Sequence, residues 1–201
     1  RLNRTEVTGT KLRISISGLT GGHSGVEIDK GRGNANVLMS RILRDAAEEA
    51  PIFIVSVEGG KKDNAIPREC LSEIIVEEDK AEAVKAAVEE AVNEIREEFA
   101  SSDADFNVTT ELSDGCSVKA VTKEDSAKAV ALIQSLPNGI MRMSQDIDNL
   151  VETSLNLGII SLDESGICLR FALRSSVGVA LKNLKNQIAC VSKTYGGSVE
   201  F

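Results

Sequence analysis

Hydrophobic and polar residues alternate along the stretch KLRISISGL, which places Leu12, Ile14 and Ile16 on one face. An alternation with a period of two predicts a half-buried β-strand. Beyond a glycine-rich loop, apolar residues recur at spacings of three and four, and Asn34 stands just before them as a good N-cap. These residues are Ala35, Leu38, Ile42 and Ala46. The chain therefore opens with a strand followed by an amphipathic helix.

Three more strands and a second helix are predicted before residue 113. Two runs rich in β-branched residues, 51–60 and 70–78, predict a hairpin. The next helix carries acidic residues mainly opposite its apolar stripe, so we expect them to face solvent. That stripe consists of Val84, Val88, Ala91, Ile95 and Phe99. With DFNVTTEL at 105–112 as the closing strand, the order is β-α-β-β-α-β, which is typical of a ferredoxin-like unit.

The second half repeats this order without residue-level identity between the halves. It predicts a strand at 116–121, a helix at 125–136, a hairpin of 150–162 and 166–176, a helix with an apolar stripe between 177 and 191, and a last strand at 197–201. We therefore expect an α+β fold. Two tandem ferredoxin-like βαββαβ units, residues 1–112 and 113–201, would form an antiparallel sheet with helices on one face.

Composition narrows the classes of function. The chain has 31 acidic and 23 basic residues, a formal net charge of −8 and 3% aromatic residues, which argues against nucleic acid as a partner. No apolar run approaches the ~18 residues of a membrane span, so no membrane partner is expected. The four cysteines show no C-x-x-C spacing, which predicts neither a zinc site nor a disulfide framework and favours a reducing, cytoplasmic location.

His23, the only histidine, lies in the loop GLTGGHSGVEIDKGRGNAN at 18–36. The residues alone leave three interpretations: a tight turn with an exposed imidazole, a phosphate cradle, or a catalytic or substrate-binding histidine held on a loop. The cradle is disfavoured because the G-x-x-x-x-G-K-[ST] motif is missing. Neither H-E-x-x-H nor G-x-S-x-G occurs, so we expect no metal ligands and no complete catalytic site in this chain.

Four segments spread over residues 18–176 carry a resemblance to a known family: GLTGGHSGVEIDKGRGNANVLMSRIL, DNAIPRE, NGIMRMSQDIDNLVETSLNLGI and LRFALRSS. Together they resemble the inserted lid (dimerisation) domain of bacterial aminoacyl-histidine dipeptidases. These are also called Xaa-His or carnosinase-like dipeptidases, within the zinc aminoacylase and carboxypeptidase family of metallopeptidases. The resemblance implies a parent hydrolase that cleaves Xaa-His type dipeptides with two zinc ions. Its metal-binding catalytic domain is absent from this sequence, so this chain alone is expected to be inactive and to bind no zinc.

A start without Met and the strand-like end GSVEF lead us to expect a segment of a longer polypeptide. Its expected partners are the dipeptide substrate, the catalytic domain of the same polypeptide and, as an open alternative, a second copy in a homodimer. Two functions of other classes stay open. One is a stand-alone ferredoxin-like module that binds a small ligand at its glycine loop, and the other is a self-association module with exposed sheet edges.

The resemblance assigns roles to three residues. His23 matches a lid histidine that helps hold the scissile carbonyl oxygen as it becomes an oxyanion. Asn64 of DNAIP matches an asparagine that contacts substrate, and Arg174 of LRSS matches an arginine that grips the substrate carboxylate. On the residues alone, Asn64 also fits a turn before Ile66, and Arg174 an exposed strand end.

The position of the arginine departs from the wider family. Simpler members of it have a lid of one unit, carry the arginine shortly after the asparagine motif, and receive the histidine from a second subunit. The corresponding stretch here, SEIIVEEDK, has no arginine. We hypothesise that the tandem repeat imitates a dimer of single lids, with His23 from one unit and Arg174 from the other. The two units would then share a continuous sheet.

Overall fold

The computed structural model describes residues 2–201. Its strands are β1 (Arg4–Ser17), β2 (Gly22–His23), β3 (Phe53–Gly59), β4 (Ala65–Ile66), β5 (Cys70–Val76), β6 (Asn107–Val121), β7 (Gly139–Met143), β8 (Val151–Asp163) and β9 (Gly166–Ser175). Its helices are α1 (Ala35–Glu49), α2 (Ala81–Glu98), α3 (Lys123–Ser135) and α4 (Gly178–Thr194), with short 3-10 turns η1 (Ile28–Lys30) and η2 (Glu78–Lys80). In this part of the chain, no helix is long and apolar enough to cross a membrane.

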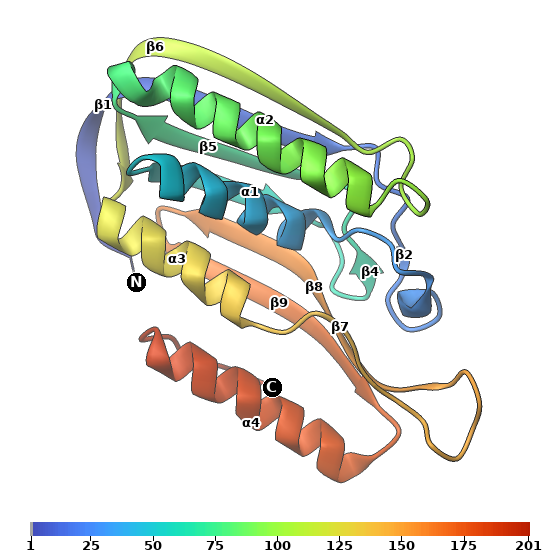
Figure 1. The fold of residues 1–201 in the computed structure, drawn as a ribbon. Helices are drawn as coiled ribbons and strands as arrows, with labels where there is room; N and C mark the ends of the chain where they lie inside the picture. The colour runs from blue at the N-terminus through green and yellow to red at the C-terminus, as the bar shows by residue number, and fades with distance from the viewer. Residues whose placement is uncertain (1) are drawn as a thin grey trace.

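Seven strands form one antiparallel sheet, and the four helices lie side by side against one face of it (Figure 1). The strand order is β6-β1-β5-β3-β8, and both β7 and β9 also pair with β8. The α+β class predicted from the sequence is confirmed. Within residues 4–121 the order β6-β1-β5-β3 is that of a ferredoxin-like unit.

A short pairing joins the two halves of the sheet. Val57, Glu58 and Gly59 of β3 lie opposite Leu162, Ser161 and Ile160 of β8. Without this contact β3 would be the open edge of the first unit. The continuous sheet required by the hypothesis of an imitated dimer is therefore present.

The second half departs from the expected βαββαβ order. β6 is one long strand that runs across residue 112, and its last residues, 116–121, pair with the start of β1. Residues 197–201 form no strand, so that prediction is wrong. Val199 packs instead on the apolar cluster beneath α4, so the end of the chain contributes to that cluster rather than to the sheet. The division at residue 112 stays a prediction.

The hydrophobic core lies between the sheet and the helices. The helix expected after Asn34 is confirmed, and its N-cap is as predicted: Oδ1 of Asn34 accepts from the backbone N–H of Asn36 at 3.0 Å and of Val37 at 3.2 Å. α1 buries Leu38, Met39, Ile42, Leu43 and Ala46. A smaller cluster under α4 contains Leu136, Leu155, Leu184 and Ile188. These two clusters hold the strands whose ends carry the candidate site.

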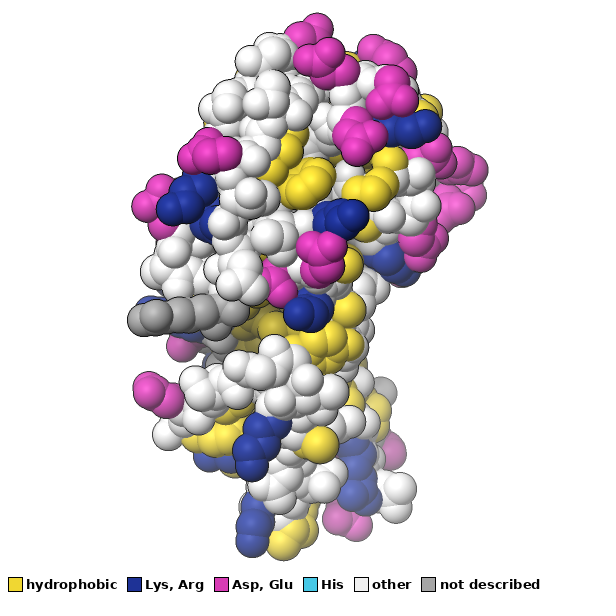
Figure 2. Space-filling view, turned by 90° about the vertical axis from the view of Figure 1, so that its left-hand side faces the viewer, with side chains coloured by type: hydrophobic (Ala, Val, Ile, Leu, Met, Phe, Trp, Pro, Cys, Tyr) yellow, Lys and Arg dark blue, Asp and Glu magenta, His cyan; other side chains and the backbone are white. Residues whose placement is uncertain are grey.

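The acidic run of α2 faces solvent, as expected. Val84, Val88 and Ile95 are fully buried, whereas the glutamates between them are exposed. Figure 2 shows acidic side chains gathered at the upper end of the molecule, where α2 lies in Figure 1. This surface is a solvated helix face.

Candidate functional site

His23 lies on a short strand that the glycine-rich loop forms between β1 and α1. β2 pairs with β4 so that His23 lies opposite Ala65, and the N–H of Ser24 donates to the carbonyl oxygen of Asn64 at 3.0 Å. The side chains of His23 and Asn64 are both exposed. Two of the three predicted site residues are therefore neighbours, although the sequence separates them by the whole of α1 and β3.

Arg174, near the end of β9, reaches the same loop. A Cβ atom placed on Gly25 would lie 2.8 Å from both Cζ and Nε of Arg174 and 3.0 Å from Cε1 of His23. The guanidinium group and the imidazole ring therefore both pack against Gly25, in space that a larger residue would fill. The structure brings together all three residues that the sequence singled out, one of them from the second half of the chain.

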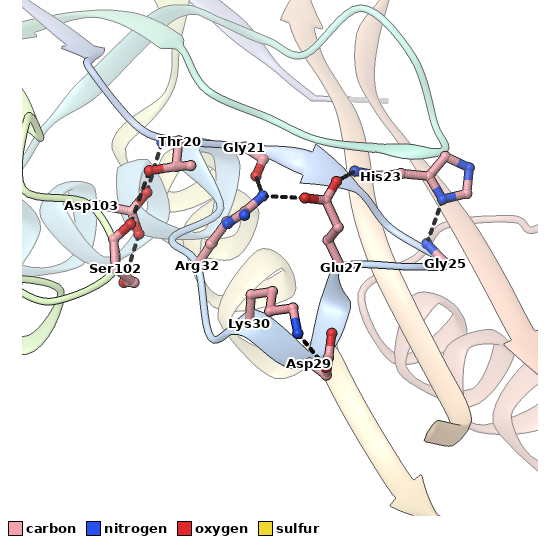
Figure 3. A network of polar contacts seen from close by, with 10 residues as sticks. All are labelled: Thr20, Gly21, His23, Gly25, Glu27, Asp29, Lys30, Arg32, Ser102 and Asp103. Carbon is pink, nitrogen blue, oxygen red and sulfur yellow. Dashed lines mark hydrogen bonds and ion pairs between the residues drawn. The ribbon is translucent and has the colours of Figure 1, made fainter. Parts of the chain in front are cut away.

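The hydrogen bonding of the imidazole defines its tautomer. The N–H of Gly25 donates to Nδ1 of His23 at 3.1 Å (Figure 3). Because Nδ1 accepts, the neutral ring carries its proton on Nε2. Nε2 is then a hydrogen-bond donor on an exposed side chain.

The ion pair between Arg32 and Glu27 stabilises the loop around His23. Oε2 of Glu27 accepts from the backbone N–H of His23 at 2.8 Å, and Nη1 of Arg32 donates to Oε1 of Glu27 at 2.8 Å and to the carbonyl oxygen of Gly21 at 2.6 Å (Figure 3). The hydrogen bond from His23 and the contact with Arg32 lower the pKa of Glu27. The carboxylate thus stays charged and holds the strand that presents the imidazole.

Asp103 ties together the two ends of the same loop. Its carboxylate accepts from the N–H of Thr20 and of Gly33, each at 2.8 Å. Burial acts to raise the pKa of Asp103, but hydrogen bonds from Gly33, Thr20 and Ser102 outweigh it, and the pKa is lowered. Two backbone donors that the loop would leave unpaired are satisfied in this way.

Asn156 is a functional candidate that sequence reasoning missed. It is 1% exposed on β8, and its Nδ2 donates to the carbonyl oxygens of Asp63 at 3.0 Å and Ala65 at 2.8 Å, on either side of Asn64. Its Oδ1 accepts from Nδ2 of Asn34 at 3.1 Å. A strand of the second half therefore holds the turn that carries Asn64. The only signal in the sequence was a polar residue within the apolar run SLNLGI.

The assembled side chains are suited to binding anions. His23 and Asn64 offer hydrogen-bond donors, and Arg174 offers a charged planar fork that matches a carboxylate. Within residues 2–201, no three His, Cys, Asp or Glu side chains lie close enough together to hold a metal ion. The site can orient a carboxylate and stabilise a developing oxyanion.

Comparisons with known proteins identify similar domains. A family model described as the peptidase dimerisation domain matches residues 14–103. The cytosol non-specific dipeptidase of Escherichia coli K12 is 31% identical over 190 residues, which cover 94% of this chain and 39% of that protein. The crystal structure of aminoacylhistidine dipeptidase from Vibrio alginolyticus superposes with a TM-score of 0.93 at 28% identity, over 99% of this chain and 41% of that one. These matches support a lid domain of this peptidase family, and the chain is called the lid domain below.

The lid domain spans about two fifths of the length of either relative. The family model includes His23 and Asn64 but ends before β6, whereas both relatives match nearly the whole lid domain. The second half of the chain is therefore matched by these two proteins as well.

Stability of the lid domain is expected to depend on pH through Asp103. Its pKa is lowered on folding, so the stabilisation is complete above the unfolded pKa of about 3.9 and is lost as the pH falls through the folded value. Asp103→Asn should therefore lower the free energy of unfolding by about 1 to 3 kcal/mol at pH 7, and by clearly less at pH 3. Urea unfolding of both proteins at the two pH values measures this. An equal loss at both would refute the role of the charge.

Asn156→Leu should loosen the turn that carries Asn64. The substitution keeps the side-chain size but leaves the carbonyl oxygens of Asp63 and Ala65 without their donor, at a cost of about 2 to 4 kcal/mol. Hydrogen exchange of the Ser24 amide should accelerate, because that amide is bonded to Asn64. Asn36→Ala is the matched control, since buried Asn36 bonds to Gly59 and Leu157 and not to the turn. Equal acceleration in both variants would contradict the assignment.

Proposed function

We propose that the lid domain serves a zinc-dependent dipeptidase of the cytoplasm that hydrolyses Xaa-His type dipeptides. One observation carries the proposal: His23 and Arg174 meet at Gly25, where they would serve as an oxyanion donor and a carboxylate clamp. The names of both relatives support it, because one is a cytosol non-specific dipeptidase and the other an aminoacylhistidine dipeptidase.

Because the imidazole of His23 and the guanidinium of Arg174 lie close together, they favour a substrate whose scissile carbonyl and carboxylate are separated by a short distance. In a dipeptide the scissile carbonyl and the terminal carboxylate belong to consecutive residues, whose Cα atoms are about 3.8 Å apart. A single small site can therefore bind both groups. Nε2–H of His23 would donate to the carbonyl oxygen, and the guanidinium of Arg174 would hold the carboxylate.

Asn64 would complete the grip on the substrate. Its main chain is held by Ser24 on one side, and its two neighbours are held by Asn156 on the other, while its amide side chain stays exposed beside His23. A fixed backbone lowers the entropy lost when the side chain orders on a ligand. Asn64 thus suits a substrate-binding role.

The lid domain would work with a catalytic domain of the same polypeptide. Two zinc ions held by that domain would supply an activated water, and the lid domain would close over the substrate and exclude solvent. A homodimer is part of the proposal, because the matching family model describes a dimerisation domain.

The proposal is tested by comparing the full-length protein with the lid domain alone. Only the full-length protein should cleave Xaa-His dipeptides, and a chelator should abolish its activity until zinc is restored. Cleavage by the purified lid domain, or full activity in chelator, would refute it. Light scattering of both proteins tests the homodimer.

A further inference from the structure

The connection between α3 and β8 is much longer than its counterpart in the first half. Residues 50–52 join α1 to β3, whereas residues 136–150 join α3 to β8 and include β7. Long connections within compact domains are usually functional. We call residues 139–150 the arm. In Figure 1 it extends beyond the ends of β8 and β9, away from the helices.

The arm presents apolar side chains to solvent. Five of the eight exposed large hydrophobic residues of the described chain lie on it, and they are Ile140, Met141, Met143, Ile147 and Leu150. Ile147 alone is 58% exposed. Clustered exposed apolar residues mark interaction surfaces, and methionines adapt well to a partner.

Hydrogen bonds hold the arm in one shape. The N–H of Ser144 donates to the carbonyl oxygen of Leu150 at 2.8 Å, and Oγ of Ser144 accepts from the N–H groups of Asp146 and Ile147. At its base Nε of Arg142 lies 3.4 Å from Oε1 of the buried Glu152. A surface that is ordered before binding loses less conformational entropy when a partner docks.

The base of the arm adjoins the site. Ser154 on β8 lies between Ile140 of the arm on one side and Arg174 on the other. A cavity of about 310 Å³ is bounded by Ile140 and by Ile28 and Arg32 of the loop that carries His23. A protein domain that presents a substrate to His23 and Arg174 therefore comes close to the arm.

We propose that the arm docks on the catalytic domain of the same protein, beside the mouth of its active site. This inference rests on the proposed function. The two relatives have about three fifths of their length outside the matched segment, enough for the catalytic domain of the proposed function. The arm bears Asp146 and Asp148 between its apolar residues. Its docking surface is thus an apolar recess flanked by basic side chains.

Ile147→Asp in the full-length protein tests this docking. The charge should be excluded from an apolar recess, and kcat/KM should fall about tenfold or more. Gln145→Asp is the matched control, because it adds the same charge at an exposed position of the same arm and removes no apolar contact. Ile147→Met should keep near-normal activity. Since Ile147 is exposed, thermal unfolding of the lid domain alone should not change.

Hydrogen exchange supplies a readout that does not depend on activity. The amides of the arm should exchange more slowly in the full-length protein than in the lid domain alone, and Ile147→Asp should remove the difference. Equal exchange in both proteins, or unchanged kcat/KM in Ile147→Asp, would overturn the docking. If the lid domain alone forms dimers and Ile147→Asp dissociates them, the docking proposal is refuted, and the arm binds a second copy of the lid domain instead. Normal kcat in a His23 variant would instead refute the proposed function and leave the exchange result standing.

Discussion

Under the proposed function, His23→Ala in the full-length protein is expected to lower kcat by about a hundredfold or more with little change in KM. The imidazole is exposed, and its Nδ1 is occupied by Gly25, so Nε2–H is the group that can meet a substrate. A donor directed at a developing oxyanion acts mainly in the transition state, and its loss lowers kcat and kcat/KM together. Steady-state kinetics on a dipeptide measures both quantities.

Two controls separate this role from others. His23→Gln keeps a donor on the side chain and should retain more activity than His23→Ala, while thermal unfolding should be unchanged in both because the ring is exposed. Zinc content should also be unchanged. A variant that loses zinc would identify His23 as a metal ligand. A near-normal kcat would show that the loop has only a structural role.

Local patterns predicted the elements that depend on neighbouring residues. The alternation at Leu12, Ile14 and Ile16 and the N-cap at Asn34 report contacts within one strand and one helix turn, and both are confirmed. β7 was missed because its apolar residues do not alternate and are exposed. The expected strand at 197–201 failed for a different reason, because its apolar Val199 packs on the cluster beneath α4 instead of pairing at an edge of the sheet.

For the candidate site, too, the sequence predicted features that depend on nearby residues but not those that depend on contacts between distant segments. The glycines around His23 pointed to an exposed loop, and the resemblance pointed to Asn64 and Arg174. Their meeting depends on the pairing of β3 with β8, a contact of three residue pairs between distant segments. Asn156 was missed because a buried asparagine is recognised by the carbonyl groups it satisfies, and these lie on another part of the chain.

Arg174→Ala is expected to raise KM as well as lower kcat/KM, by about ten- to a hundredfold. The carboxylate of a dipeptide is charged in both the ground state and the transition state, so a clamp on it stabilises both alike. Arg174→Lys should recover only part of the loss, because an ammonium group keeps the charge but not the bidentate fork. Kinetics of the three proteins on one dipeptide gives the comparison.

Arg170 provides the matched control for this prediction. It lies four residues earlier on β9, is exposed like Arg174 and projects from the same face of the strand, yet it pairs opposite Ile159 rather than Ser154. Arg170→Ala therefore removes the same charge at a distance from Gly25 and should leave KM unchanged. A dipeptide with an amidated C-terminus adds a second check, because Arg174→Ala should hardly alter its already weak binding. If Arg174→Ala raises KM equally for the acid and the amide, the guanidinium supports the loop rather than the substrate carboxylate.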